Sequence, residues 1–272
     1  MEPQKLPMNH SSHHTAEGEM ISLVDVKGKW ALITGASRGV GYQTALFMAE
    51  QGCNLILHSR DLAHTATVEQ EVKALGVEAY CVQAELGKHE EVVAMLDEIE
   101  DKRTVVDIVF NNAAVQIAYR ADYWNTPVDD YEQSFRINFI SVATICNRFI
   151  PKMIERGFGR VINTTSGIKN EPEQSGYAAS KAALDKFTKD LASRLDGTDV
   201  ILSLTDPGWC RTDLGGPNAT SPVESVIPGI AVGAFVDDKK SGRFLHAQAF
   251  TGMTLAEAVT KAETMEATPY VI

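Results

Sequence analysis

Tyr177 and Lys181 are two residues whose types and spacing suit acid–base chemistry. They lie four positions apart in a segment, 176–195, that predicts a helix, so both side chains project from one helix face. A free tyrosine titrates near a pH of about 10, which is too high for an efficient proton carrier at neutral pH. A neighbouring ammonium stabilises the phenolate and lowers the tyrosine pKa. The spacing alone fits equally an exposed tyrosine beside a solvated lysine, so its meaning depends on its surroundings.

A glycine-rich turn near the start of the chain is typical of a phosphate-binding loop. Residues 34–41 read TGASRGVG and follow an apolar stretch that predicts a buried strand. Glycine permits positive φ and a close approach of the backbone to a pyrophosphate, and the following helix offers free N–H groups. Many glycine-rich turns bind no ligand. We infer a dinucleotide site here because this turn follows the first strand of an alternating α/β pattern. The candidate contacts are Gly35, Ser37, Arg38, Gly39, Val40 and Gly41.

The end of the second predicted strand indicates which dinucleotide is bound. An NAD site usually places Asp or Glu about 20 residues beyond the glycines. Here Ser59 and Arg60 occupy that place, and the first carboxylate is Asp61. Arg60 is placed to meet a 2′-phosphate, with Arg38 on the other side, because a guanidinium donates paired hydrogen bonds. The sequence therefore favours NADP(H) over NAD(H), although Asp61 and a purely solvated role for both arginines stay open.

Apolar stretches alternate with amphipathic ones along the chain. The predicted strands are 29–34, 53–58, 77–83, 105–110, 160–165, 200–204 and 242–246. The predicted helices are 39–52, 62–75, 88–101, 128–156 and 176–195. Strands that are apolar throughout belong to a parallel sheet covered on both faces. We expect an α/β fold, a single-domain Rossmann-type doubly wound parallel sheet of about seven strands, with ligands at the carboxyl ends of the strands.

No linker divides the chain into separate domains. The sequence predicts a flexible N-terminal arm over 1–26, one Rossmann-fold domain over 27–255 and a C-terminal extension over 256–272. Of the 272 residues 44% are hydrophobic and 22% charged, which is ordinary for a globular protein with a sizeable core.

The composition also argues against several partners and locations. The formal net charge of −11 opposes binding to nucleic acid phosphates and to anionic membranes. No apolar stretch is long enough to span a bilayer, and none resembles a signal peptide. The four cysteines are scattered, which favours reduced thiols. We therefore expect a cytoplasmic protein without a metal centre.

Several motifs follow the predicted strand ends in a fixed order. After the glycine turn come Asn111-Asn112-Ala113, Asn138, Ser166, the segment YAASK over 177–181, and Pro207-Gly208. Together they resemble the short-chain dehydrogenase/reductase family in its single-domain branch, over roughly residues 26–250. The segment 207–216 resembles that of carbonyl-reductase-like members.

The resemblance implies roles for four catalytic residues. Tyr177 is the proton donor in reduction and the base in oxidation, and Lys181 lowers its pKa and binds the nicotinamide ribose. Ser166 polarises the substrate oxygen, and Asn138 holds a water that links Lys181 to solvent. The family's commoner spacing would select Thr164 instead of Ser166. The alignment of the strand end selects Ser166, because a loop shortens more easily than a buried strand shifts register.

The resemblance also implies further cofactor contacts. Asn112 and Ala113, with Asn111 before them, line the cofactor beyond the fourth strand. Glu85 stands where the family usually has Asp near the adenine, with Leu86 beside it. The nicotinamide is flanked by Pro207, Gly208 and Thr212, in addition to Tyr177 and Lys181.

These features together predict NADPH-dependent reduction of a ketone or aldehyde to an alcohol, or the reverse reaction. Two alternatives remain at this stage: a catalytically silent dinucleotide-binding sensor, and an NAD-preferring alcohol or sugar dehydrogenase. The expected partner is a small carbonyl or alcohol substrate under a loop over 213–240. Four aromatic residues could either line the substrate pocket or belong to ordinary packing: Tyr119, Tyr123, Trp124 and Trp209. We also expect a homo-oligomer, a dimer or tetramer built through the helices that carry Asn138 and Tyr177.

Overall fold

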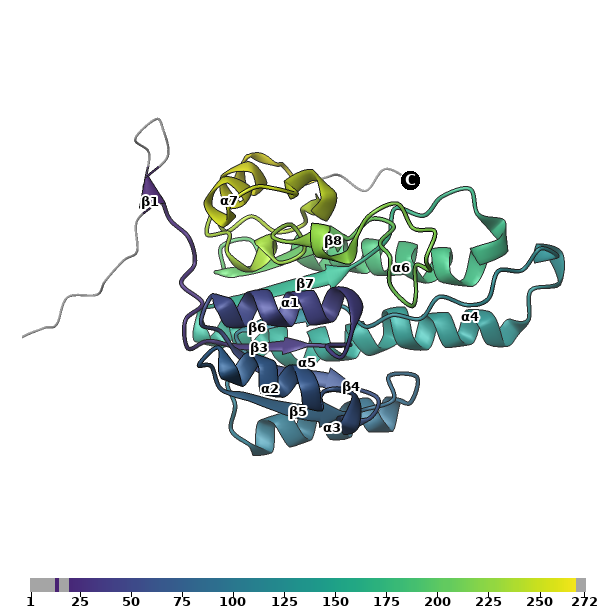
Figure 1. Ribbon diagram of the computed structural model, residues 1–272, viewed down its shortest axis with the longest axis horizontal. Coiled ribbons are helices and arrows are strands. Elements are labelled where there is room, and N and C mark those ends of the chain that lie inside the picture. The colour runs from purple at the N-terminus through teal and green to yellow at the C-terminus, as the bar shows by residue number, and fades with distance from the viewer. Residues whose placement is uncertain (1–12, 15–19, 268–272) are drawn as a thin grey trace, which may run out of the picture.

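The central feature of the computed structural model, which describes residues 13–14 and 20–267, is a sheet of seven parallel strands. The spatial order is β5-β4-β3-β6-β7-β8-β9, with the direction of winding reversing between β3 and β6 (Figure 1). The strands are β3 (Trp30–Ile33), β4 (Asn54–Ser59), β5 (Ala79–Gln83), β6 (Ile108–Asn111), β7 (Gly159–Thr164), β8 (Val200–Asp206) and β9 (Phe244–His246). A separate antiparallel pair joins β1 (His13–His14) to β2 (Met20–Ile21). The predicted doubly wound Rossmann-type sheet is confirmed.

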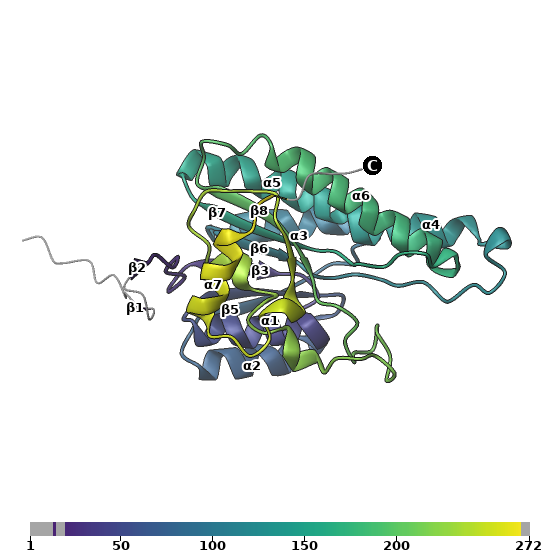
Figure 2. The same ribbon diagram turned by 90° about the horizontal axis from the view of Figure 1, so that it is seen from above.

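Helices cover both faces of this sheet (Figure 2). One face carries α1 (Gly39–Glu50), α2 (Ala66–Ala74) and α7 (Leu255–Thr264), and the other carries α3 (His89–Asp101), α5 (Ser141–Arg156) and α6 (Ser175–Ala192). Ala31 and Ile33 of β3 pack into the first core, whereas Leu32 packs into the second. Successive strand residues point to opposite faces, so a sheet buried on both sides needs strands that are apolar at every position.

The helix predicted over 128–156 is interrupted. Helix α4 (Val128–Phe135) passes into a π-helical turn, Arg136–Ile140, before α5 begins. Asn138 lies in this turn. Such turns insert one residue into a helix and are frequent at functional sites, and the apolar periodicity on either side gives no sign of them. The helix predicted over 62–75 likewise starts as a 3₁₀ turn before α2.

Both predicted chain-end boundaries cut across packed structure. Val24 and Val26, at the end of the predicted arm, are buried, and the Val24 N–H donates to the Phe235 carbonyl at 3.1 Å. Residues 1–12 and 15–19 of the arm lie outside the described residues. Helix α7 crosses the predicted boundary at 255/256, and its Ala258 and Val259 belong to the core. Within the described ranges, no helix combines the length and the apolarity that a bilayer crossing requires.

Candidate active site

The turn between β3 and α1 has the geometry of a phosphate cradle. Gly35 and Gly39 adopt φ angles of +67° and +58°, a region that favours glycine. A Cβ atom on Gly41 would lie 2.1 Å from the Gly35 carbonyl oxygen, so α1 can start this close to the turn only with glycine there. Arg38 at the N-cap makes no side-chain capping bond, and the first helical turn holds no acidic residue. Free N–H groups and the positive end of the helix dipole are thus available, and the turn fits a dinucleotide pyrophosphate.

Thr34 fastens this turn to the end of β6. Its hydroxyl oxygen accepts from the backbone N–H groups of Asn112 at 2.9 Å and Ala113 at 3.0 Å. The predicted cofactor residues Asn112 and Ala113 therefore lie beside the glycine turn. Asn111 does not join them: its amide donates to the Asn163 Oδ1 at 2.8 Å inside the sheet. Neighbouring residues at a strand end point to opposite faces, which explains why only part of this motif faces the turn.

His58 is a residue of this edge that the sequence analysis did not single out. The Gly35 N–H donates to its Nδ1 at 3.2 Å, and its Nε2 lies 3.1 Å from the Ala84 carbonyl oxygen. These partners place the ring proton on Nε2. Burial lowers the pKa of His58 to about 4, although the bond to Ala84 opposes the shift. The neutral ring joins the glycine turn to the ends of β4 and β5. Its sequence signal is a histidine inside an otherwise apolar strand, which must find buried partners.

Helix α6 brings Tyr177 and Lys181 together beneath the end of β7. Both side chains are buried. Tyr177 forms a side-chain hydrogen bond with Ser166, and the Lys181 Nζ donates to the Thr164 carbonyl oxygen at 2.7 Å. The Nζ atom lies 5.8 Å from the centre of the Tyr177 ring. Of the two hydroxyl residues considered at this strand end, Ser166 reaches Tyr177, whereas Thr164 offers its carbonyl oxygen to Lys181.

Burial shifts the proton affinities of this pair in opposite directions. It raises the pKa of Tyr177, which the hydrogen bond with Ser166 partly opposes and the charge of Asp206 reinforces. It lowers the pKa of Lys181 to about 8, against the attraction of Asp185 and Asp206. The Tyr177 pKa is raised on balance, because removing a phenolate from water is costly. The lowering of the Tyr177 pKa by Lys181, which the family resemblance implies, stays a prediction. Tyr177 carries its proton at neutral pH.

The Asn138 side chain forms hydrogen bonds both to the loop after β6 and to α6. Its Nδ2 donates to the Val115 carbonyl at 2.9 Å and to the Ser180 hydroxyl at 3.0 Å. Its Oδ1 accepts from the Val115 N–H at 2.8 Å. Both amide protons are used, and one lone pair of Oδ1 remains. The side chain thus fixes the loop after β6 against α6, the helix that carries Tyr177.

The segment after β8 returns to the glycine turn. It begins with the predicted Pro207-Gly208 turn. A Cβ atom on Gly39 would lie 3.2 Å from the Thr212 methyl group, so Thr212 lies against the start of α1. An ion pair of 2.7 Å between Arg38 and Asp213 joins the same two segments. Residues predicted to flank a nicotinamide and residues predicted to hold its pyrophosphate are thereby adjacent.

Comparison with known proteins agrees with this arrangement. Residues 29–221 match the family described as short chain dehydrogenase. The chain belongs to this family. A 3-oxoacyl-[acyl-carrier-protein] reductase of Staphylococcus epidermidis, FabG, is 30% identical over 220 residues, which cover 77% of this chain and 86% of the relative. Short-chain dehydrogenases are oxidoreductases of alcohol and carbonyl groups that use nicotinamide cofactors, and this chain is such an enzyme.

Solved structures share the fold of this short-chain dehydrogenase. A blue fluorescent protein from a metagenomic library, in complex with NADPH, matches with a TM-score of 0.72 and 24% identity, covering 82% of this chain and 97% of that one. A 3-oxoacyl-[acyl-carrier protein] reductase from Brucella melitensis with bound NAD matches with a TM-score of 0.73 and 23% identity, covering 82% and 90%. One of these two structures holds NADPH and the other NAD.

The end of β4 carries the residues predicted to distinguish these dinucleotides. Arg60 is exposed and makes no hydrogen bond or ion pair within the described part of this short-chain dehydrogenase. The Asp61 carboxylate accepts from the Ala63 N–H at 2.9 Å and caps the 3₁₀ turn before α2. Ser59 is buried and donates to the Asp61 carbonyl oxygen at 2.6 Å. The carboxylate is thus engaged, while the guanidinium is not.

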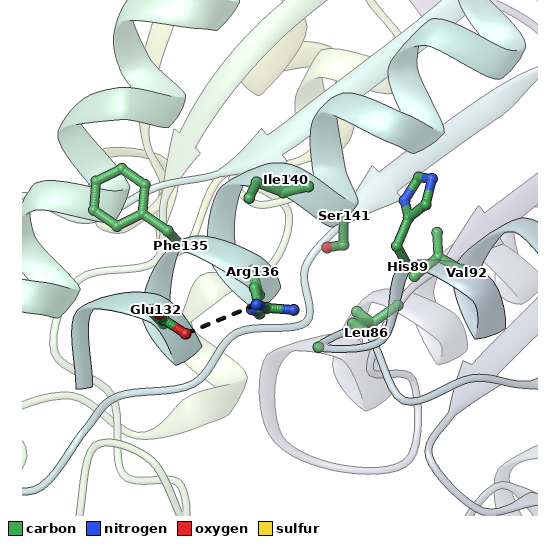
Figure 3. Close-up of a pocket in the computed structure, with 9 residues that line it drawn as sticks. Leu86, His89, Val92, Glu132, Phe135, Arg136, Ile140 and Ser141 are labelled. Atoms are coloured by element: carbon green, nitrogen blue, oxygen red, sulfur yellow. Dashed lines mark ion pairs between the residues drawn. The ribbon is translucent and has the colours of Figure 1, made fainter. Parts of the chain in front are cut away.

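A cavity of about 450 Å³ opens at the end of β5 (Figure 3). Leu86, predicted to lie near the adenine, is on its wall, and the Glu85 carboxylate accepts from the Gly87 N–H at 3.2 Å. Figure 3 shows the Glu132–Arg136 pair of the α4 region across the cavity from Leu86. The lining residues are Leu86, Gly87, His89, Val92, Glu132, Phe135, Arg136, Ile140 and Ser141. None of the four predicted catalytic residues is among them.

Proposed function

We propose that this short-chain dehydrogenase is an NADPH-dependent reductase of a ketone or aldehyde. The observation that carries the proposal is the state of Tyr177. Its side chain is buried, hydrogen-bonded to Ser166 and four residues from the buried Lys181, whose Nζ donates to the Thr164 carbonyl oxygen. A proton donor already in place beside a second hydroxyl suits reduction, where an oxygen must receive a proton.

The predicted residues divide the reaction between them. The Ser166 hydroxyl donates a hydrogen bond to the substrate carbonyl oxygen and draws electron density toward it. The reduced nicotinamide, when bound, supplies the hydride that forms the new C–H bond. Tyr177 donates its proton to the same oxygen, forming the O–H bond of the alcohol. Lys181, held on the Thr164 carbonyl, places a cation near the phenolate that remains.

Arg60 supports the choice of NADPH. It extends from the end of β4 without a partner among the described residues, while Asp61 caps the next turn. A 2′-phosphate gives that guanidinium a bidentate partner, whereas a 2′-hydroxyl needs a free carboxylate. Arg38, paired with Asp213 at an exposed position, is a second contact that a phosphate can capture.

The substrate is proposed as a carbonyl compound with an apolar portion. Tyr119, Trp124 and Trp209 expose large aromatic surfaces on segments that flank the predicted site, with 63%, 86% and 56% of each residue exposed. The relative from S. epidermidis is named for 3-oxoacyl substrates. A screening panel therefore includes 3-oxoacyl thioesters together with aliphatic and aromatic ketones and aldehydes.

The proposal is tested by NADPH consumption over this panel and by the variant Tyr177→Phe. Loss of the proton donor is expected to lower kcat by about 10²- to 10⁴-fold, while NADPH still binds in calorimetric titration. The matched control is Tyr80→Phe, which removes a half-buried hydroxyl of β5 that donates to the Thr104 hydroxyl. We expect this variant to keep wild-type turnover. Full activity in Tyr177→Phe contradicts the assignment. Cofactor binding without turnover of any carbonyl favours a sensor.

We further propose a cytoplasmic location and a homo-oligomer. All four cysteines are unpaired thiols, which suits a reducing compartment. Val142 and Ile145 of α5 are buried in the core, whereas Ile140, at the end of the π-helical turn, is 44% exposed and offers an apolar contact for a second copy. Light scattering after size exclusion distinguishes dimer or tetramer from monomer.

A further inference from the structure

Asp206, the last residue of β8, joins two segments that meet at the proposed site. Its Oδ1 accepts from the Gly208 N–H at 2.9 Å, and its Oδ2 accepts from the Gly167 N–H at 3.1 Å. Gly167 directly follows Ser166, and Gly208 belongs to the turn predicted to flank the nicotinamide. The Asp206 carboxylate thus links two segments: the loop that carries the Ser166 hydroxyl, proposed to hold the substrate oxygen, and the turn proposed to face the nicotinamide.

This carboxylate is buried to an unusual degree for a group with few ion-pair partners. Asp206 is 8% exposed, and among the described residues it pairs with the His246 Nδ1 on β9, 3.5 Å from Oδ2, while its charge also acts on the buried Lys181. Burying a carboxylate costs several kcal/mol unless hydrogen bonds and opposite charges offset the loss of water. Two backbone N–H groups supply part of that compensation. A neutral residue would avoid the cost, so the charge itself is a candidate for a role.

The surroundings of Asp206 are rich in titratable groups. Its charge raises the pKa of Tyr177 and of Lys181, and it also raises the pKa of Asp185. The titratable groups around it are Tyr177, Lys181 and Asp185 on α6, His246 on β9 and Cys210 after β8. Asp206 is therefore coupled to the proposed proton donor without contacting it through a hydrogen bond.

We propose that Asp206 is a positioning residue: it holds the Ser166 loop and the Pro207-Gly208 turn at a fixed separation and places a negative charge beside the proposed proton donor. This inference rests on the proposed function, because it assigns Tyr177 the role of proton donor. It adds a residue that acts through others. The two parts of the role, the hydrogen bonds and the charge, can be separated by mutation.

The first test is Asp206→Asn, which keeps the shape and removes the charge. An amide accepts from one glycine N–H but presents N–H atoms to the other. We expect kcat to fall by about ten- to a hundredfold, because the two segments lose their fixed spacing. Within about 10 Å and at an effective dielectric of about 20, one charge shifts a pKa by roughly one unit. The limb of the pH profile that belongs to Tyr177 should move to lower pH by about that amount.

The second test is Gly167→Ala, which disturbs the bond and keeps the charge. A Cβ atom there would lie 2.9 Å from the Asp206 Oδ2, so the loop must shift. We expect a lower kcat with the Tyr177 limb at its wild-type pH. The matched control is Asp107→Asn, another carboxylate that accepts a backbone N–H, from Trp30, at the amino ends of β3 and β6. It should leave kcat and the pH profile unchanged.

A readout independent of turnover separates this inference from the proposed function. Phenolate absorbance is titrated in the wild type and in Asp206→Asn, each minus its Tyr177→Phe counterpart, which isolates Tyr177 from the other tyrosines. A lower Tyr177 pKa in Asp206→Asn supports the inference even if no carbonyl of the panel is reduced. An unchanged Tyr177 titration and kcat in Asp206→Asn overturn it. So does an equal shift of the pH profile in Gly167→Ala, because the charge would then not be the cause.

Discussion

The Nδ1 atom of His58 accepts a hydrogen bond from the backbone N–H of Gly35 at 3.2 Å, so a buried imidazole fixes the first glycine of the phosphate cradle. The opposite nitrogen of the ring lies 3.1 Å from the Ala84 carbonyl oxygen. The bond from Gly35 requires an unprotonated Nδ1, and the bond to Ala84 places the ring proton on Nε2. A protonated ring would turn Nδ1 into a donor facing another donor. Protonation of His58 therefore opposes the folded cradle.

This relationship predicts acid sensitivity of the fold. The folded-state pKa of His58 is about 4, below its ordinary value of 6.5. The stability that neutral His58 contributes to the fold is fully present above pH 6.5 and is lost as the pH falls through about 4. It amounts to about 3 kcal/mol of unfolding free energy, at 1.4 kcal/mol for each pH unit of difference. Urea unfolding of wild type and His58→Leu at several pH values should give a flatter dependence for the variant. The control is His64→Gln, at an exposed histidine, which should keep the wild-type slope of unfolding free energy against pH. An equally steep slope in His58→Leu would falsify the assignment of the acid sensitivity to His58.

Ser166→Ala is expected to lower kcat by about 10²- to 10³-fold, because the substrate oxygen loses a hydrogen-bond donor. The Ser166 hydrogen bond also lowers the Tyr177 pKa, so its removal raises that pKa further. The pH profile of kcat/KM should therefore move to higher pH, opposite to the shift expected for Asp206→Asn. Ser193→Ala, an exposed hydroxyl at the end of α6, is the control. Full activity in Ser166→Ala would transfer the role to another group.

Arg60→Ala is expected to weaken NADPH binding by about ten- to a hundredfold, since charge-assisted hydrogen bonds contribute roughly 1.5–3 kcal/mol. NADH binding should change little, because NADH has no 2′-phosphate. Affinities of both cofactors are measured by fluorescence titration. Arg103→Ala is the matched control, as an exposed arginine in the loop between α3 and β6. Equal losses for both cofactors would show that Arg60 does not read the 2′-phosphate.

Asp213→Asn is expected to strengthen NADPH binding modestly. Arg38 and Asp213 form an exposed ion pair of 2.7 Å, and such pairs contribute about 0.2–1 kcal/mol. Releasing Arg38 for the phosphate should raise affinity by a factor of about 1.4 to 5, with little change in thermal stability. Asp190→Asn, which removes the exposed partner of Lys186, is the control. Weaker NADPH binding in Asp213→Asn would mean that Asp213 supports the cofactor rather than competing with it.

The sequence by itself determined the sheet, the glycine turn and the placement of Tyr177 and Lys181 on one helix face. These features are local: strand and helix periods and short spacings do not depend on distant residues. Even so, local pattern missed the π-helical turn at Asn138, because the apolar residues on both sides continue a helical period. The family resemblance, rather than periodicity, pointed to Asn138 and Ser166.

Only the tertiary structure decided the partners of the polar groups. His58 meets Gly35 across 23 positions of sequence, and Asp206 meets Gly167 across 39. Such contacts follow from which strand ends are neighbours and in what register, so no spacing in the chain announces them. The direction in which the Tyr177 pKa shifts was likewise decided by burial, a property of the packed molecule that no spacing in the chain reveals.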